Sequence, residues 1–345
     1  YAGLNYYSQG HRRYTTPESL SVTLRSGLVC GTDGLTDLYS MEKKLFAFAS
    51  ILVSFCCLVI FSSFNEKETI NPDTTGVSTG FQQHISSFDL DKPFSFAGES
   101  IPDGNFDALE RLDRELIINT YLHSALLLNI KLANRYFSVI EPILEQYSIP
   151  EDFKYLCVAE SNLRMATSPA GAKGLWQFME PAGKAYGLEI NAEVDERYHV
   201  EKSTEAACKF ILHLKKRFGS WTMAAAAYNM GETILSKRIT DQRANSFYDL
   251  NLNEETSRYL FRIISIKEIM NDPEQFGFFV DKEHLYPPFN DYYTIHVEGP
   301  IPNLADLAVK HGTSYRMLKV YNPWLIGSLL TNKSGKRYEI RVPKK

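Results

Sequence analysis

From Phe106 onward, apolar residues recur every three to four positions, which is the spacing of amphipathic helices. The positions that set this spacing in the first part of the region are Leu109, Leu112, Leu116, Ile117, Ile130, Leu132, Phe137, Ile140, Ile143 and Leu144. Each such helix has an apolar stripe that must be covered by a neighbour. The pattern therefore predicts a mainly α domain of packed helices over residues 105–280.

The later helices of this region carry clear end signals. They are predicted from Pro181 to Tyr186, around Ser203-Thr204-Glu205 and on to about Phe218, from Trp221 to Tyr228, and from Glu254 to Met270. Gly187, Gly219 and Gly231 follow the first three, and glycine is the preferred residue just beyond a helix end. Asn271-Asp272-Pro273 then ends the helical pattern.

Beyond Tyr286-Pro287-Pro288 the pattern changes. The segment 293–297 alternates like a strand, 304–310 and 315–321 have the spacing of short helices, and 338–342 resembles a closing strand. We therefore predict a small α+β module with the order βααβ over residues 286–345.

The N-terminal part contains a pattern typical of an export signal. Met41 is the first methionine; Glu42, Lys43 and Lys44 follow it, and then an apolar run over 45–61. We expect translation to begin at Met41 with residues 1–40 as upstream read-through, or else residues 1–40 to be a disordered arm. Residues 41–64 are then either a cleaved signal peptide or an uncleaved membrane anchor, since the run is about long enough to span a bilayer. Either choice places the protein in the periplasm or on the cell-envelope membrane.

Residues 65–104 are rich in Ser, Thr, Gly, Asp and Asn with scattered Phe, which predicts a flexible linker. The whole chain has 345 residues, 44% hydrophobic residues and a net charge of −4. That composition is typical of a globular protein and lacks the basic excess of a nucleic-acid binder, so we expect no nucleic-acid partner. We expect a monomer.

No metal site or other cofactor is expected from the sequence. His199 and His213 stand apart, without further ligands at metal-binding spacing. Of the five cysteines, only Cys157 and Cys208 fall in the predicted helical domain. Both lie among apolar residues, which favours buried free thiols over a disulfide.

The most informative stretch for chemistry runs from Lys154 to Met179. An apolar run, 155–159, leads directly to Glu160, and Ser161-Asn162 then favours a turn. Glu160 should therefore lie at the negative end of a short buried helix. Both the helix dipole and the apolar neighbours disfavour its charged form, so we expect a raised pKa. A carboxylic acid protonated near neutral pH suits cleavage of a glycosidic bond.

A lone glutamate is more often a solvated surface residue. The residues that follow favour a site instead. Gly171 and Gly174 predict a tight loop whose backbone can approach a ligand closely. Trp176, Gln177 and Phe178 offer ring stacking and amide hydrogen bonds, the usual means of holding a sugar.

Four short blocks now carry a family resemblance: Ala159-Glu160-Ser161, Gly174-Leu175-Trp176-Gln177-Phe178-Met179, Ala227-Tyr228-Asn229, and Tyr259. Residues from about 106 to 270 resemble the lytic transglycosylase domain of bacterial murein-degrading enzymes, nearest to the membrane-bound type D branch. The resemblance implies a lysozyme-like all-α fold. It also implies an exported enzyme that acts on peptidoglycan glycan strands.

The resemblance also implies residue roles. Glu160 would be the general acid and then the base, and Ser161 and Tyr228 would orient its carboxylate. The implied substrate-binding residues are Ser168, Gly174, Trp176, Gln177, Phe178, Asn229 and Tyr259. Among them, Gln177 and Asn229 would hold sugar hydroxyls or N-acetyl groups, and Tyr259 would close the site.

Two alternatives remain open. A muramidase would use water and a second carboxylate. Its candidates are Glu180, Glu189, Asp195 and Glu196, of which the last two adjoin Arg197 and favour an ion-pair cluster. The resemblance implies instead that the muramyl 6-hydroxyl attacks internally and leaves a 1,6-anhydro ring. The second alternative is an inactive peptidoglycan-binding scaffold.

Residues 292–343 resemble a degenerate LysM module. Asn322-Pro323-Trp324 and the flanking strands match that family. Glu298-Gly299-Pro300 replaces the usual Gly-Asp-Thr after the first strand. We therefore expect residues 286–345 alone to bind murein weakly or not at all.

Overall fold

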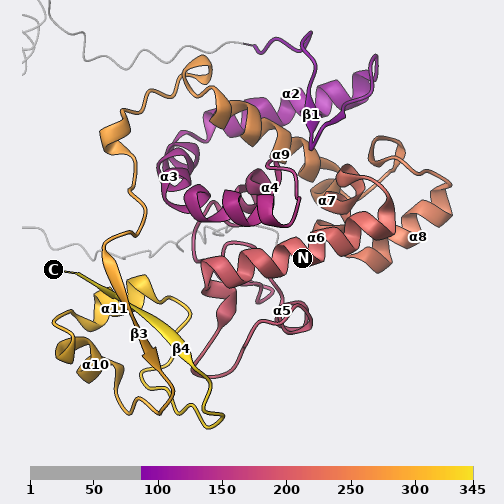
Figure 1. Cartoon of the computed structure of the whole chain (residues 1–345). Helices are drawn as coiled ribbons and strands as arrows, with labels where there is room; N and C mark the ends of the chain where they lie inside the picture. The colour runs from indigo at the N-terminus through magenta and orange to yellow at the C-terminus, as the bar shows by residue number, and fades with distance from the viewer. Residues whose placement is uncertain (1–86, 345) are drawn as a thin grey trace, which may run out of the picture. The chain divides into compact units, whose positions relative to one another are not determined.

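A computed structural model describes residues 87–344 of the chain (Figure 1). The expectations for residues 1–40 and 41–64, and for the linker as far as residue 86, lie outside this part. The described elements are β1 (Ser95–Phe96), β2 (Glu99–Ser100), α2 (Phe106–Tyr121), α3 (His123–Gln146), α4 (Phe153–Ser161), α5 (Glu180–Ala185), α6 (Val200–Phe218), α7 (Trp221–Met230), α8 (Glu232–Gln242), α9 (Glu254–Asn271), β3 (Tyr292–Val297), α10 (Leu304–Lys310), α11 (Tyr315–Tyr321) and β4 (Tyr338–Pro343). The predicted fold class, a mainly α domain followed by a small α+β module, is confirmed.

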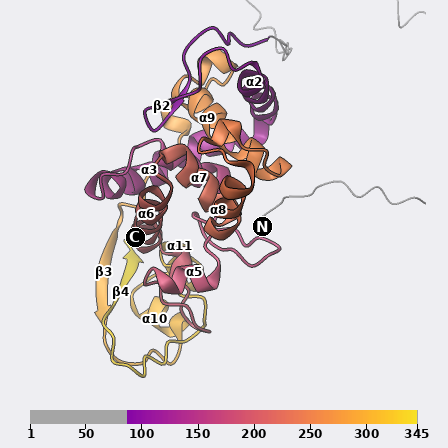
Figure 2. The same ribbon diagram turned by 90° about the vertical axis from the view of Figure 1, so that its right-hand side faces the viewer.

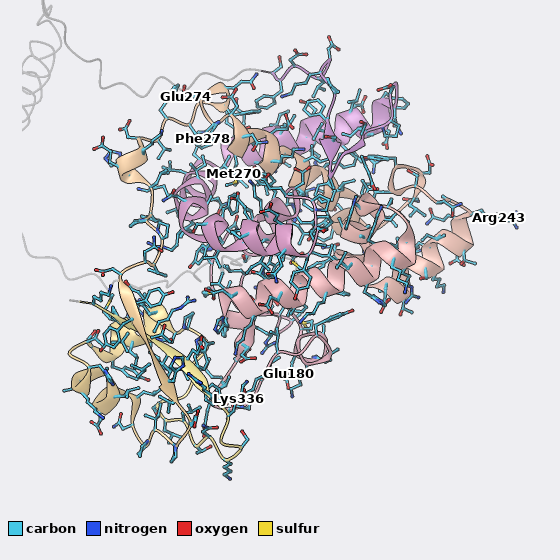
Figure 3. All side chains as sticks on the ribbon, viewed as in Figure 1. Glu180, Arg243, Met270, Glu274, Phe278 and Lys336 are labelled. Atoms are coloured by element: carbon cyan, nitrogen blue, oxygen red, sulfur yellow. The ribbon has the colours of Figure 1, made fainter. Side chains whose placement is uncertain are left out.

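Helix α9 is the central element of the helical domain. It packs against α2, α4 and α7, while α6 packs against α3 and α7 (Figures 1 and 2). Half of its residues are buried: Thr256, Tyr259, Leu260, Phe261, Ile263, Ile264, Ser265, Ile266 and Ile269. Burial on several sides explains why apolar residues of α9 are not confined to one stripe. Side chains fill the space that the ribbons of α2, α3, α4 and α9 enclose (Figure 3).

Helix α4 lies inside this packing and ends where the sequence predicts. Its residues 153–158 are all buried, and Asn162 ends it in the left-handed conformation at φ 51°. Asp152, just before the helix, accepts hydrogen bonds from the Ala97 amide at 2.7 Å and from Lys267 Nζ at 2.8 Å. The start of α4 is thereby tied to both the N-terminal hairpin and α9.

The flexible-linker prediction is wrong for residues 87–104. There β1 and β2 form an antiparallel hairpin, and Phe94, Phe96 and Ile101 are buried in the core of the helical domain. The Glu99 carboxylate accepts the backbone amides of Trp221 and Thr222, at 2.6 and 2.8 Å, at the start of α7. A carboxylate at this position satisfies amides that an α-helix leaves free and faces the positive end of its dipole.

Helix α8 is not predicted from the sequence. Leu235 is its one buried residue, so the sequence of α8 carries little of the apolar spacing that marks packed helices. Among residues 87–344, no single helix is long and apolar enough to cross a membrane; α2 and α3 reach that length and composition only together, with a bend of 84° between them.

The C-terminal module has the predicted order β3–α10–α11–β4. Its two strands pair antiparallel, with Tyr293 opposite Val342 and Ile295 opposite Ile340. Its buried core includes Leu304, Ala308, Leu318, Trp324, Leu330, Ile340 and Val342. The Asn322 side chain links α11 to β4, because its amide nitrogen donates to the carbonyls of Leu318 at 2.8 Å and Arg341 at 2.6 Å.

The module is joined to the helical domain by the segment between α5 and α6, a contact that the sequence does not predict. Val194 is fully buried within the core of the module. Beside it, the Asp195 amide donates to the Trp324 carbonyl at 2.9 Å, and the Glu193 carbonyl accepts the amides of Ile326 and Gly327. Lys336, labelled in Figure 3, pairs with Glu189 at 2.5 Å and with Glu196 at 3.3 Å. The module thus helps to hold residues 189–201.

Candidate active site

Glu160 is the penultimate residue of α4, as the sequence predicts, and its side chain is partly buried. The Tyr259 hydroxyl, from α9, donates a hydrogen bond to Glu160 Oε1. The site is therefore built where the end of one buried helix meets the middle of another. Packing between α4 and α9 determines the distance between these two side chains.

The electrostatics at Glu160 favour a protonated carboxyl. Burial is the largest influence and raises its pKa from 4.5 to about 7. The hydrogen bond from Tyr259 and the charge of Arg262 act in the opposite direction and lower the pKa, whereas the nearby Glu255 charge raises it. A group with this pKa is present in both protonation states near neutral pH, so it can donate a proton and later accept one.

Neither Ser161 nor Tyr228 bonds the Glu160 carboxylate, which corrects the roles expected for them. The Ser161 hydroxyl donates back to the Cys157 carbonyl at 3.2 Å within α4, a common bond of helical serine. The Tyr228 hydroxyl donates to the Trp176 carbonyl at 2.7 Å. Burial, together with the Glu160 charge, raises the pKa of Tyr228 well above 10, so this phenol stays a neutral donor. Tyr259 is the residue that contacts the carboxylate.

The loop between α4 and α5 is held by its own hydrogen bonds. The Gly174 amide donates to the Ala166 carbonyl at 3.0 Å, and the Ser168 hydroxyl accepts the Ala172 amide at 3.0 Å. Gln177 has a positive φ of 49°, and its Nε2 donates to the Gly174 carbonyl at 2.8 Å. Ser168 and Gln177 therefore use part of their hydrogen-bonding capacity within the loop, and their contacts with substrate stay predictions.

Trp176 and Phe178 do not form an exposed stacking surface, so that expectation is wrong. Trp176 is fully buried, and its Nε1 donates to Thr204 Oγ1 on α6 at 2.9 Å. Phe178 is 3% exposed and packs against the rings of Phe210 and Tyr228, with centroids 6.3 and 6.5 Å away. Large rings in this loop anchor it to α6 and α7, because each buried ring removes a large apolar surface from water.

A close contact within the chain requires glycine at position 174. Its φ is +79°, and a Cβ added there would lie 1.9 Å from the carbonyl oxygen of Arg197. The backbone of residue 197 therefore closely approaches Gly174, and the contact of Gly174 with substrate stays a prediction. Asn229, at the end of α7, accepts a 2.8 Å hydrogen bond from the Thr256 hydroxyl of α9, which leaves its amide nitrogen for other partners.

Arg197 holds the loop between α4 and α5, a role that the sequence does not indicate. It forms a two-pronged ion pair with Asp195, from Nε to Oδ1 at 2.8 Å and from Nη2 to Oδ2 at 2.7 Å. Its Nη1 also donates to the carbonyls of Gly171 and Phe178, both at 3.2 Å. Arg197 therefore links the loop between α4 and α5 to residues 189–201, the segment that contacts the C-terminal module. The adjacent Asp and Arg indicate an ion pair in the sequence, but nothing there indicates the two carbonyls.

The Asp195 carboxylate is almost fully buried, at 1% exposure. Burial by itself raises its pKa, but the bonds and charges of Arg197 and Lys173 outweigh burial and leave the pKa below its usual value. Asp195 is consequently a permanent anion at neutral pH and not a proton donor. The expected ion-pair cluster is present.

Cys157 and Cys208 are both free and buried, as predicted. Burial raises the pKa of Cys157 well above 9 and that of Cys208 to about 12, so both stay neutral thiols. Within residues 87–344, no three His, Cys, Asp or Glu side chains are grouped so that they could hold a metal ion.

Two regions of the chain match known families. Residues 138–251 match the family described as "Transglycosylase SLT domain". Residues 293–345 match the family described as "Soluble lytic transglycosylase C-terminal LysM-like domain". The two matches cover the parts of the chain that hold Glu160 and the βααβ module.

Several known proteins are similar to the chain. Membrane-bound lytic murein transglycosylase D of Escherichia coli (strain K12) is 30% identical over 265 residues, which cover 73% of this chain and 56% of that protein. The protein of the same name from E. coli O6:H1 gives the same values. The chain thus spans about half the length of these relatives.

Two weaker similarities complete the comparison. A putative tributyltin chloride resistance protein of Alteromonas sp. (strain M-1) is 33% identical over 111 residues, 32% of this chain and 54% of that protein. Among solved structures, an inactive mutant of the lytic transglycosylase Slt from Pseudomonas aeruginosa aligns with 44% of this chain and 26% of that one. Its sequence identity is 18% and its TM-score is 0.35.

Proposed function

We propose that the chain, which matches the transglycosylase SLT domain family and a C-terminal LysM-like domain family, is a lytic transglycosylase of the cell envelope. Its proposed substrate is the β-1,4 bond between N-acetylmuramic acid and N-acetylglucosamine in peptidoglycan. The observation that carries the proposal is Glu160, a partly buried carboxyl at a helix end whose pKa is raised to about 7.

In the proposed reaction, Glu160 transfers its proton to the glycosidic oxygen as the bond to the muramyl anomeric carbon breaks. The N-acetyl group of the substrate assists at that carbon. The Glu160 carboxylate then takes the proton from the muramyl 6-hydroxyl, whose oxygen forms the new bond to the anomeric carbon. The products are a 1,6-anhydromuramyl end and a free N-acetylglucosamine end, and the enzyme regains its proton. An internal nucleophile has a high effective concentration, so no water is needed.

The carboxylates that a hydrolase would need are engaged elsewhere, which supports this route over the muramidase. Asp195 pairs with Arg197. The other candidates pair with lysines: Glu180 with Lys184 at 2.7 Å, Glu189 with Lys336 at 2.5 Å, and Glu196 with Lys202 at 2.5 Å. Glu255, which the sequence does not single out, influences the pKa of Glu160 but pairs with Arg262 at 3.0 Å.

The Tyr259→Phe variant tests the protonation state that the reaction requires. Since Glu160 must be protonated in the first step, kcat/KM should fall as pH rises through about 7. The Tyr259 hydroxyl lowers the Glu160 pKa, so its removal should raise that pKa and move the alkaline limb to higher pH. The rate of solubilisation of purified sacculi, measured from pH 5 to 9, would show the shift.

The Tyr228→Phe variant is the matched control, because the Tyr228 hydroxyl bonds a backbone carbonyl and not the carboxylate. The alkaline limb of its kcat/KM profile should stay at the wild-type pH. A Tyr259→Phe limb at the wild-type position, or one shifted to lower pH, would show that Glu160 is not the titrating acid.

A further inference from the structure

A cavity of about 320 Å³ lies between the helical domain and the LysM-like module, and the proposed reaction does not use it. Residues from α3, from the start of α6 and from α11 line it, and Glu160 is not among them. Side chains of the helical domain and of the LysM-like module thus line the same cavity. Its volume is at the lower end of the range usual for small-ligand sites.

The charges around this cavity leave two guanidinium groups without a carboxylate partner among the described residues. Arg135 donates from Nε to the Pro287 carbonyl at 3.0 Å and lies over the ring of Phe289, 4.4 Å from its centroid. Its two terminal nitrogens have no carboxylate within ion-pair distance among the described residues. Arg316, on α11, is exposed and likewise has no ion pair in residues 87–344.

Two carboxylates, Glu201 and Glu339, line the cavity, against four cationic side chains: Arg135, Arg316, Lys319 and Arg341. Glu201 pairs with Arg341 and lies 3.2 Å from His199 Nδ1. Glu339 is 3.7 Å from His296 across the strand pair. The surplus charge of the cavity is therefore positive, and it is carried by planar groups that bind carboxylates with two parallel hydrogen bonds.

Aromatic side chains form much of the remaining wall. Tyr198 and Tyr321 line the cavity with Trp324, whose ring stacks on Tyr338 at a centroid distance of 5.8 Å. Tyr198 is held by a 2.8 Å hydrogen bond between its hydroxyl and that of Thr167, in the loop that follows α4. Rigid rings beside free guanidinium groups suit a ligand that has both apolar surface and carboxylates.

We propose that this cavity binds the carboxylates of the peptidoglycan stem peptide, so that Arg135 and Arg316 favour glycan strands that carry peptides. The proposal rests on the proposed function, because it takes peptidoglycan as the substrate. The chemistry distinguishes the peptide from the glycan. Once the lactyl group of muramic acid is joined to the peptide, the glycan is neutral, and the free carboxylates of murein belong to the stem.

The test measures binding to the full chain by isothermal titration calorimetry. One probe is the stem peptide released from sacculi by an amidase, and the other is a chitin oligosaccharide, a neutral chain of N-acetylglucosamine that carries no carboxylate. Arg316→Glu reverses the charge at the cavity. Arg337→Glu makes the same change at an exposed residue of the module that does not line it. Thermal melts establish that both variants fold.

We expect the free peptide to bind the wild type, and more weakly as salt is added. Arg316→Glu should weaken that binding at least about fivefold, whereas Arg337→Glu should leave it within about twofold. Absence of peptide binding at millimolar concentration would overturn the proposal. Equal losses in both variants, or a chitin oligosaccharide that loses affinity in Arg316→Glu, would also overturn it. The free peptide has no glycosidic bond, so this result is independent of whether the protein cleaves murein.

Discussion

The Glu160→Gln variant should lose roughly a hundredfold to ten-thousandfold in the rate of murein solubilisation, the usual contribution of general acid–base catalysis. Glutamine keeps the volume of the side chain and can still accept the Tyr259 hydrogen bond, but it can neither donate nor accept the catalytic proton. Because both proton transfers are assigned to this one carboxyl, no other described side chain replaces it.

The variant should fold at least as well as the wild type. The folded-state pKa of Glu160 is raised above 4.5, so the folded protein holds the acid proton more tightly than the unfolded chain does. The free energy of unfolding of the wild type should therefore fall as pH rises from about 4.5 to about 7, whereas Glu160→Gln removes the titrating group and with it this dependence. The difference in thermal midpoint between variant and wild type should increase in favour of the variant over this interval.

Asp195→Asn is the matched control for catalysis, because Asp195 is also a buried carboxylate but lies in an ion pair. Its turnover per folded molecule should stay within a few-fold of wild type, measured well below its unfolding temperature. A folded Glu160→Gln variant that solubilises sacculi at the wild-type rate would refute the assignment of Glu160. An inactive, folded Asp195→Asn variant would favour the muramidase.

The Arg197→Ala variant should lose up to about 3–5 kcal/mol of unfolding free energy, since it leaves the buried Asp195 carboxylate with only Lys173, at 3.3 Å, as an ion-pair partner. It also removes the donor to the Gly171 and Phe178 carbonyls. Arg197→Lys keeps the charge but not the planar fork, so its loss should be smaller. Urea unfolding followed by circular dichroism measures the unfolding free energies of both variants.

Arg238→Ala is the control for this stability measurement. Arg238 is exposed on α8, and its replacement should change the unfolding free energy by no more than about 0.5 kcal/mol. If the unfolding free energy of Arg197→Ala also stays within about 0.5 kcal/mol of the wild type, Arg197 does not hold the 171–178 loop in the way described.

The elements that could be predicted from the sequence are those with strong local signals. The end of α4 near Glu160 follows from the buried run 153–158 and the turn residue Asn162. The elements of the module follow from alternation and helical spacing. In contrast, α8 buries one residue, and the hairpin at 95–100 consists of two-residue strands, so neither produces a periodic pattern.

The candidate site could be predicted in its central residue but not in its contacts. The residue types around Glu160 do not distinguish a ring that faces a sugar from one that faces α6, which is why the expectation for Trp176 and Phe178 is wrong. Gly174 faces residue 197, which is 23 positions later, and Val194 enters the core of a module that begins about 90 positions later. Such contacts depend on how separate elements pack, and no local pattern records them.

The most direct test of the proposed function is mass spectrometry of the muropeptides released when the protein digests purified sacculi. Because the candidate second carboxylates Glu180, Glu189, Asp195 and Glu196 are all in ion pairs, we expect muramyl products with a 1,6-anhydro ring, each lighter by one water than its hydrolysed counterpart. Products with reducing muramyl ends and no anhydro form would contradict the lytic transglycosylase and identify a muramidase. An absence of any released muropeptide would instead favour the inactive scaffold.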